Sequence, residues 1–281
     1  MRHNTDPSNK KLRAEYSTAV KADSIVARIR FILRRLAFSL QRMLVPELIH
    51  SHERYRRFLQ ERTALGSDWL DVGCGKAIIS PWLRNSLDSE KELVSRCNRV
   101  AGVDCGDDLP HRSIKERYCA RAESIPFVND SFSQVTANMV VEHFTDPETA
   151  LREICRVLRP EGLFMFHTPN ARSPLIALSR IIPSRVRSAI AAFLDGRNEE
   201  DIFPTYYRLN DTGRIKLIAE RSGFSVSSVE FVENYPVLAM LGPVVVIELF
   251  AIRLLRLQKF AYLRPNLLVV LQKSELNTRG C

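Results

Sequence analysis

The chain has 281 residues, a formal net charge of +9 and an apolar fraction of 45%. That length and that apolar fraction suffice for one large globular domain with additions, so a wholly disordered chain is excluded. The six cysteines contain no Cys-x-x-Cys pair and no metal-ligand spacing, so we expect a reducing cytosol and no metal site.

The positive charge is concentrated in residues 1–66, which hold 14 Lys plus Arg against 6 Asp plus Glu, a balance of +8. The rest of the chain is therefore close to neutral. A near-neutral surface argues against a catalytic face that holds nucleic acid, so nucleic acid is not an expected partner there. Contact between the basic N-terminal arm and RNA or protein stays open.

The N-terminal region divides into a leader and basic helices. Residues 1–22 are polar and lack the apolar core of a secretion signal, which predicts a flexible leader. Basic amphipathic helices are expected over residues 23–66. The first of them, over 24–45, has an apolar stripe flanked by arginines: Ile25, Ile29, Ile32, Leu36, Leu40 and Met43. This helix either lies in a membrane interface or packs on the domain or on a second subunit.

A second helix is predicted from Glu47 to Glu61, because Pro46 ends the first. Its apolar spacing directs Tyr55 and Phe58 at the core.

A strand, a glycine turn and a helix are predicted next. Residues 67–73 form the strand, and Gly73 and Gly75 allow a sharp turn and the close approach of a ligand to the backbone. The pattern from Lys76 to Leu83 predicts a helix, which Pro81 shifts toward Ile79. The N–H groups at the start of such a helix would face a carboxylate or a phosphate.

A second strand, Val100–Asp104, ends in a carboxylate about 30 residues after the turn. A carboxylate at that place accepts both hydroxyls of a ribose. A dinucleotide-binding dehydrogenase is the rival interpretation. It requires G-x-G-x-x-G, and Ile78 stands where the last glycine should fall.

The remaining periodic segments predict further strands and helices. The expected strands are Arg117–Arg121, 133–140, 163–168, 223–233 and 266–273. The expected helices are 146–158, which begins at Asp146 with Pro147, and 211–222.

The motifs between residues 67 and 170 resemble the class I S-adenosylmethionine-dependent methyltransferases. They run in one order from the glycine turn and Asp104 through Arg121–Phe127, Asn138–His143, Leu158–Gly162 and Thr168–Asn170. The resemblance implies an α/β fold with a doubly wound, seven-stranded, mostly parallel Rossmann-like sheet whose last strand is antiparallel. It places the methyltransferase domain at residues 67–281, with N-terminal helices and a helical insert before the last strand.

The resemblance also implies S-adenosyl-L-methionine as the methyl donor. It assigns the methionine carboxylate to Gly73, Cys74 and Gly75, and the ribose hydroxyls to Asp104. Asp71 would shape the turn and orient the amino group, and Asn138 would lie near the methionine end. Ala122 and Glu123 would lie near adenine; because Arg121 stands where the family has an acidic residue, a backbone carbonyl or Glu123 would take that role. Tyr55 is a candidate for a lid over the cofactor by its position.

Two insertions depart from the family pattern. Residues 171–210 contain a basic helix near Ser184–Leu194 and the run Tyr206, Tyr207, Arg208, which is either an acceptor pocket or a packed tyrosine corner. Residues 235–263 are largely apolar but are interrupted by Pro243 and Glu248. This insert is too short for a clean span, so a helical hairpin is expected that packs on the N-terminal helix, extends an oily acceptor channel or enters one leaflet.

The expected reaction is methyl transfer to a small, lipophilic acceptor, with O-methylation favoured. A hydroxyl acceptor requires a base, for which His143 is the first candidate and Glu142 the second. In the alternative interpretation, Glu142 and His143 pack the following helix. Two other functions stay open: a protein or RNA methyltransferase docked by the basic arm, and a non-catalytic pseudo-enzyme.

The expected partners follow from the two apolar regions. Residues 24–45 and 236–260 are the candidates for peripheral membrane contact, which would place a cytoplasmic protein on the inner face of a membrane. A homodimer through the same regions is the alternative.

Overall fold

The computed structural model describes residues 28, 32–33, 35–106, 110–181, 204–238 and 243–274. The predicted leader 1–22 and the predicted basic helix near 184–194 lie outside the described residues. The chain forms two compact units: a larger one of residues 49–235 and 255–281, and a smaller one of residues 1–48 and 236–254.

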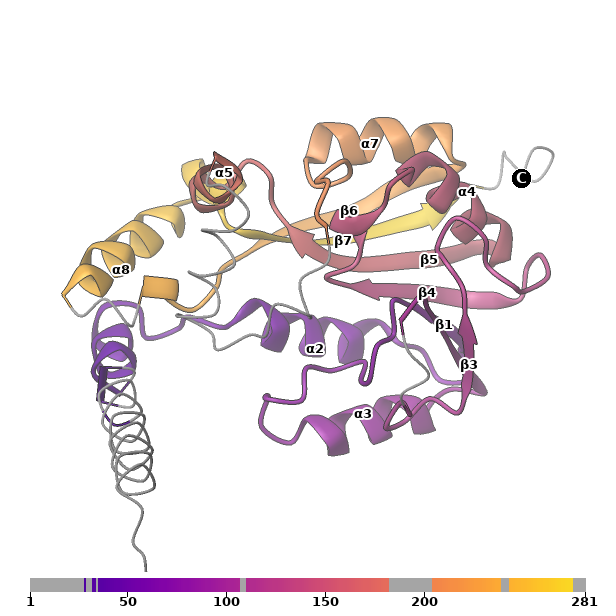
Figure 1. Ribbon diagram of the computed structural model, residues 1–281, viewed down its shortest axis with the longest axis horizontal. Coiled ribbons are helices and arrows are strands. Elements are labelled where there is room, and N and C mark those ends of the chain that lie inside the picture. The colour runs from indigo at the N-terminus through magenta and orange to yellow at the C-terminus, as the bar shows by residue number, and fades with distance from the viewer. Residues whose placement is uncertain are drawn as a thin grey trace, which may run out of the picture. The chain divides into compact units, whose positions relative to one another are not determined.

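The larger unit is built on one seven-stranded sheet (Figure 1). Its order is β3-β2-β1-β4-β5-β7-β6, and every neighbouring pair is parallel except the two pairs that β7 makes with β5 and β6. The strands are β1 Asp68–Val72, β2 Arg99–Asp104, β3 Glu116–Cys119, β4 Phe132–Asn138, β5 Leu158–Pro169, β6 Phe224–Val232 and β7 Asn266–Lys273. This arrangement confirms the predicted doubly wound sheet with an antiparallel last strand.

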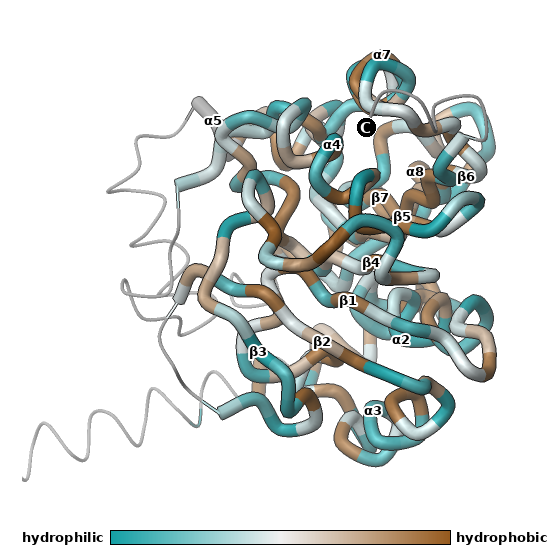
Figure 2. The backbone as a smooth tube through the Cα atoms, turned by 90° about the vertical axis from the view of Figure 1, so that its right-hand side faces the viewer, coloured by the Kyte–Doolittle hydropathy of each residue, from teal (hydrophilic) through white to brown (hydrophobic). Residues whose placement is uncertain are grey.

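Helices cover both faces of the sheet (Figure 1). One face packs against α2 (Ser51–Arg62) and α3 (Ser86–Ser95), where Tyr55 and Phe58 are buried with Trp69 of β1. The other face packs against α4 (Pro147–Val157) and α7 (Thr212–Arg221), where Leu70 of β1 is buried. Successive strand residues point to opposite faces, so Trp69 of β1 is buried on one face of the sheet and Leu70 on the other. In Figure 2, α3 and α7 carry hydrophobic and hydrophilic residues side by side, as expected for helices with one buried face.

The predicted helix over Lys76–Leu83 is wrong: residues 76–85 are a loop, and α3 begins only at Ser86. Pro81 has no backbone N–H to donate, and Asn85 has φ 55°, in the left-handed region, so no helix runs through them. The helix expected from Glu47 begins at Ser51 instead, with His50 as its N-cap.

β5 is longer than the predicted strand 163–168 because pairing with β4 already begins at Leu158. The strand has an irregularity after Leu158, where the pairing register with β4 shifts between Phe132 and Gln134.

The remaining elements are short. In the larger unit, the described residues also form η1 (Val141–His143), α5 (Pro174–Ile181) and η4 (Gln258–Leu263). The smaller unit contains a helix over residues 35–44 and most of α8 (Val244–Leu255). Within the described residues, none of the helices is both long enough and apolar enough to span a membrane.

Candidate active site

The glycine turn after β1 is held by backbone hydrogen bonds and borders open space. The N–H groups of Gly73 and Cys74 donate to the Val103 carbonyl oxygen at 2.7 and 3.2 Å. Gly73 and Gly75 have φ of 68° and 50°, which favour glycine. A Cβ on Gly73 would lie 2.2 Å from Val140 Cγ2, whereas a Cβ on Gly75 would meet no atom within 4 Å. The backbone at Gly75 is therefore the part of the turn that a ligand can approach.

Asp104, at the end of β2, is joined directly to this turn. Its Oδ2 accepts a hydrogen bond from the Gly75 N–H at 2.8 Å, and its Oδ1 accepts one from the Gly106 N–H at 2.7 Å. The turn and the second-strand carboxylate thus form one cradle. The helix N-terminus expected beside the turn is absent, because the next helix is α3, so the N–H groups at the cradle belong to the turn itself.

Asp71 and Cys74 lie beneath the cradle. Thr136 Oγ1 donates to Asp71 Oδ1 at 2.5 Å and accepts from the Trp69 indole N–H at 2.7 Å. Burial raises the pKa of Asp71 to about 7, and it raises the pKa of Cys74 to about 12. Both side chains are buried, at 3% and 1% exposure, so they support the strand end from inside the fold.

The residues predicted near adenine form a small group of their own. Ala122 is buried, and Glu123 Oε1 accepts a hydrogen bond from Thr145 Oγ1 at 2.9 Å. Arg121 Nε lies 3.9 Å from Glu123 Oε2 while most of the Arg121 side chain is exposed. The assignment of Glu123 to adenine stays a prediction.

The candidate base and the candidate acceptor residues meet at η1. The Glu142 carbonyl oxygen accepts from the N–H of Tyr206 at 2.8 Å and of Tyr207 at 3.3 Å. His143 Nδ1 lies 2.7 Å from the Pro204 carbonyl oxygen. Because a carbonyl can only accept, Nδ1 carries the proton and Nε2 is the basic nitrogen.

Arg208 also holds the segment 204–208 against η1 and the residues that follow it. Its guanidinium donates to the Thr145 carbonyl oxygen and lies over the Tyr206 ring, 5.3 Å from the centroid. The fold therefore brings Glu142, His143 and the 206–208 run together at the carboxyl end of β4.

The Glu142 side chain itself points into the protein. Thr168 Oγ1 donates to Glu142 Oε2 at 3.0 Å, and Asn210 Nδ2 donates to Thr168 Oγ1 at 2.6 Å. With 3% of the residue exposed, burial raises the pKa of Glu142 to about 7. Sequence reasoning did not single out Asn210, because a buried anchor of this kind leaves no local pattern.

Asn138 ends β4 and contacts a residue that sequence reasoning missed. Its Oδ1 accepts from His167 Nδ1 of β5 at 2.9 Å, and the next residue, Met139, has φ 58°. His167 is fully buried, and burial holds its pKa well below the ordinary value. The signal in the sequence was a histidine directly after the apolar run 163–166.

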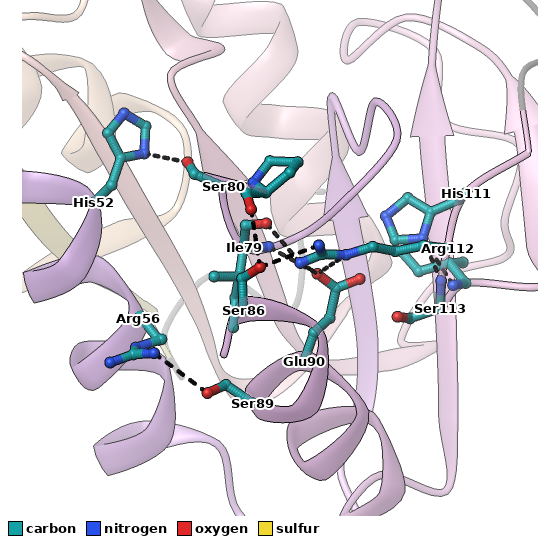
Figure 3. A network of polar contacts seen from close by, with 12 residues as sticks. His52, Arg56, Ile79, Ser80, Ser86, Ser89, Glu90, His111, Arg112 and Ser113 are labelled. Atoms are coloured by element: carbon teal, nitrogen blue, oxygen red, sulfur yellow. Dashed lines mark hydrogen bonds and ion pairs between the residues drawn. The ribbon is translucent and has the colours of Figure 1, made fainter. Parts of the chain in front are cut away.

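The loop that replaces the predicted helix is fixed by a buried ion pair (Figure 3). Arg112 Nε donates to Glu90 Oε2 at 2.8 Å, and Glu90 is fully buried. The same Oε2 accepts from the Ile79 N–H at 3.1 Å, while Arg112 Nη2 donates to the Ile79 carbonyl oxygen at 2.8 Å. This clamp gives the loop after the cradle one defined conformation.

No metal centre is found among the residues that the structure describes, since no group of three or more His, Cys, Asp or Glu side chains there could hold an ion.

A family model described as a methyltransferase domain matches residues 46–229. A human protein named "Ubiquinone biosynthesis O-methyltransferase, mitochondrial" is 29% identical over 129 residues, which cover 45% of this chain and 35% of that protein. A "Ubiquinone biosynthesis O-methyltransferase" of Pseudomonas entomophila is 30% identical over 141 residues, which cover 44% of this chain and 54% of that protein. The matched regions thus span about a third to a half of these relatives.

Solved structures give more distant matches. YcgJ from Bacillus subtilis has a TM-score of 0.45 at 14% identity, over 80% of this chain and 98% of that one. The [4+2]-cyclase SpnF has a TM-score of 0.46 at 18% identity, over 79% of this chain and 80% of that one.

Proposed function

Because this chain belongs to the class I S-adenosylmethionine-dependent methyltransferases, we propose that it methylates a hydroxyl group of a small, lipophilic acceptor. The observation that carries the proposal is the meeting of His143 with the segment 204–208 at the end of β4. The insertion 171–210 is the proposed acceptor pocket, and an imidazole held in one orientation beside it is suited to taking a proton from a bound hydroxyl.

The cradle fits the methyl donor. Open space above Gly75 leaves its backbone accessible to a carboxylate, which we assign to the turn of Gly73, Cys74 and Gly75, and Asp104 can exchange its hydrogen bonds from backbone N–H groups for ribose hydroxyls. We assign adenine to Ala122 and Glu123 and the methionine end to Asn138. When bound, S-adenosylmethionine supplies a methyl group already activated by its sulfonium.

The chain must then align the acceptor oxygen, exclude water and accept one proton. His143 Nε2 takes the hydroxyl proton as the new oxygen–carbon bond forms and the sulfur–carbon bond breaks. The Pro204 carbonyl accepts from Nδ1–H and so holds the ring in the tautomer whose acceptor nitrogen is Nε2. Tyr206, Tyr207 and Arg208 are assigned to the wall of the acceptor pocket.

The O-methyltransferase names of the curated relatives support a hydroxyl as the acceptor group. The apolar surface of the smaller unit supports a lipophilic acceptor. On α8, four side chains at spacings of three and four residues form an exposed stripe: Val244, Ile247, Phe250 and Leu254. The helix over 35–44 adds the exposed residues Leu36, Phe38 and Met43.

The reaction is tested by incubating purified protein and methyl-labelled S-adenosylmethionine with host-cell extract. We expect label in the lipid or organic small-molecule fraction, reduced about tenfold or more in Asp104→Ala because the ribose hydroxyls lose their acceptor. Asp104→Asn, which can still accept from the Gly75 N–H, controls for the shape of the cradle. Label in the protein or RNA fraction would contradict this proposal and indicate a protein or RNA methyltransferase whose substrate is docked by the basic N-terminal arm. Failure of the purified protein to bind the methyl donor would indicate a non-catalytic pseudo-enzyme.

We propose further that residues 24–45 and 236–260 hold the protein at the cytoplasmic face of a membrane. Apolar residues on exposed helices, together with the exposed cations Arg42 and Arg253, fit an anionic interface.

Co-sedimentation with phosphatidylglycerol–phosphatidylcholine vesicles tests this. The double variant Ile247→Asn/Phe250→Asn should bind about tenfold more weakly, because two apolar side chains no longer enter the interface. Leu217→Asn, which replaces an exposed leucine on α7 of the larger unit, should bind as the parent does. Unchanged vesicle binding with a loss of dimer in sedimentation velocity would assign the stripe to a homodimer instead.

A further inference from the structure

The insertion 171–210 leaves and rejoins the sheet at one point. Ala171, its first residue, donates its N–H to the carbonyl oxygen of Asn210, its last residue, at 2.8 Å. The fully buried Asn210 side chain attaches this junction to the end of β5, where its Nδ2 donates to Thr168 Oγ1 at 2.6 Å and to the Pro169 carbonyl oxygen at 2.9 Å. The end of the insertion is therefore fixed at Asn210.

Two successive backbone N–H groups just before this end meet at one oxygen. Those of Tyr206 and Tyr207 both donate to the Glu142 carbonyl oxygen, at 2.8 and 3.3 Å. Tyr207 has φ 52°, in the left-handed region that residues with a Cβ avoid, and a left-handed residue in a turn can point neighbouring N–H groups at one site. A strained residue persists only where the surrounding contacts fix it, and such residues are concentrated at functional sites.

Thr168 joins these two attachments through side chains. The Pro169 carbonyl can only accept, so the amide atom of Asn210 that faces it and Thr168 is the nitrogen. Thr168 Oγ1 accepts from Asn210, which leaves its single hydroxyl proton for Glu142 Oε2 at 3.0 Å. We call Asn210, Thr168 and Glu142 the anchor network. All three residues are buried, so a partner lost by mutation is not simply replaced by bulk water.

The anchor network fixes the carbonyl that orients the candidate base. His143 follows Glu142 in η1, and its Nδ1 lies 2.7 Å from the Pro204 carbonyl oxygen. Pro204 comes two residues before Tyr206, whose N–H is held by Glu142, so the same contacts place the carbonyl that receives Nδ1–H. Thr168 is fully buried and therefore acts through these contacts rather than on a bound acceptor.

We propose that Thr168 and Asn210 are positioning residues for His143. They hold Glu142 and the segment 204–208 in the arrangement that keeps the proton of the neutral imidazole on Nδ1. This inference rests on the proposed function, in which Nε2 of His143 accepts the hydroxyl proton. Without the Thr168 hydroxyl, Glu142 Oε2 and Asn210 Nδ2 each lose a partner, the segment 204–208 loses one attachment and the His143 ring can change tautomer.

NMR of the histidine rings in the ¹⁵N-labelled full chain tests the proposal. Long-range nitrogen–proton correlation spectra distinguish a ring protonated at Nδ1 from one protonated at Nε2, and His143→Gln identifies the signals of His143. The spectra are recorded at about pH 8.5, where histidine rings are neutral. Methyl transfer into the organic fraction of host-cell extract and the affinity for S-adenosylhomocysteine are measured on the same variants.

We expect the parent to show His143 in the Nδ1–H form. Thr168→Val, which keeps the branched shape and removes the hydroxyl, should show a mixture with the Nε2–H form and about tenfold slower methyl transfer. Thr168→Ser restores the hydroxyl and should behave as the parent does. The affinity for S-adenosylhomocysteine should be unchanged in both variants.

Thr63→Val is the matched control. Thr63 is also buried, at the end of α2, and its Oγ1 accepts from Gln134 Nε2 at 3.3 Å. Removing this hydroxyl should cost folding stability but leave the His143 tautomer and methyl transfer as in the parent. Asn210→Ser, whose shorter side chain does not reach Thr168, is the second variant and should reproduce the tautomer change even if Thr168→Val does not fold.

An Nδ1–H form of His143 that persists in the Thr168→Val and Asn210→Ser variants would overturn the proposal. An equal tautomer change in Thr63→Val would overturn it too, because any buried hydroxyl would then have the same effect. The proposed function fails by different signs: S-adenosylhomocysteine does not bind the parent, or His143→Gln transfers methyl groups at the parent's rate. Neither of those results changes what the tautomer of His143 says about Thr168 and Asn210.

Discussion

Gly73→Ala is expected to lose about 2–5 kcal/mol of folding stability, more than any other single methyl group added at the cradle. Two costs add at this position. The backbone has φ 68°, which disfavours any residue with a Cβ, and that Cβ would lie 2.2 Å from Val140 Cγ2. Val140 is β-branched, which restricts its χ1 rotamers, and both of its methyl carbons and its Cβ would lie within 3.0 Å of the new Cβ. Urea unfolding followed by circular dichroism measures the loss.

Gly75→Ala is the matched control for this prediction. Its φ is 50°, but a Cβ there meets no atom within 4 Å, so only the conformational cost of about 1–2 kcal/mol applies. This variant should fold and yet bind S-adenosylhomocysteine poorly, since its methyl group enters the space left for the ligand. Adding Val140→Ala to Gly73→Ala should recover the part of the stability lost to the clash. Equal stability of the two alanine variants would contradict the packing argument.

Glu142→Gln is expected to gain stability relative to the parent as pH rises. Between pH 4.5 and pH 8, the difference in unfolding free energy between the two proteins should shift in favour of the variant by up to about 3 kcal/mol. Burial raises the pKa of Glu142 from 4.5 to about 7, so between these values the folded state binds more protons than the unfolded state. The unfolding free energy of the parent therefore falls as pH rises through this window. The glutamine has no proton to lose and can still accept the hydrogen bond from Thr168.

Urea midpoints at pH 4.5, 6 and 8 for the parent and the variant give the measurement. Asp71 also titrates near pH 7, but it is present in both proteins, so its contribution cancels in the difference. The exposed Glu220→Gln serves as the control, and its stability difference from the parent should stay flat with pH. If the stability difference between Glu142→Gln and the parent also does not change with pH, ionisation of the buried Glu142 carboxyl does not destabilise the folded state.

Local sequence was sufficient for the sheet and for the cradle. β7 has the predicted bounds, because an uninterrupted apolar run after Pro265 has few ways to be buried other than as a strand covered on both faces. Gly73, Gly75 and Asp104 could be picked out because a ligand that approaches the backbone needs missing Cβ atoms at fixed places in the chain. α4 begins where Asp146 and Pro147 predict it, since capping is an interaction between near neighbours.

Tertiary structure decided what near neighbours do not determine. The loop 76–85 has the apolar spacing of a helix, but the buried pair of Glu90 and Arg112 fixes it as a loop after the cradle. The orientation of His143 depends on the carbonyl of Pro204, which lies 61 residues away in the chain. The ring contacts of His50 with Trp82 and Tyr235 could not be predicted at all, because the three residues have no common period and lie far apart in the chain. The sequence by itself therefore determined the glycine turn and Asp104 as the candidate donor site, because a sharp turn depends on local backbone geometry. Only the tertiary structure showed how His143 and the run 206–208, which the sequence had also singled out, lie against one another, because their contacts join segments far apart in the chain.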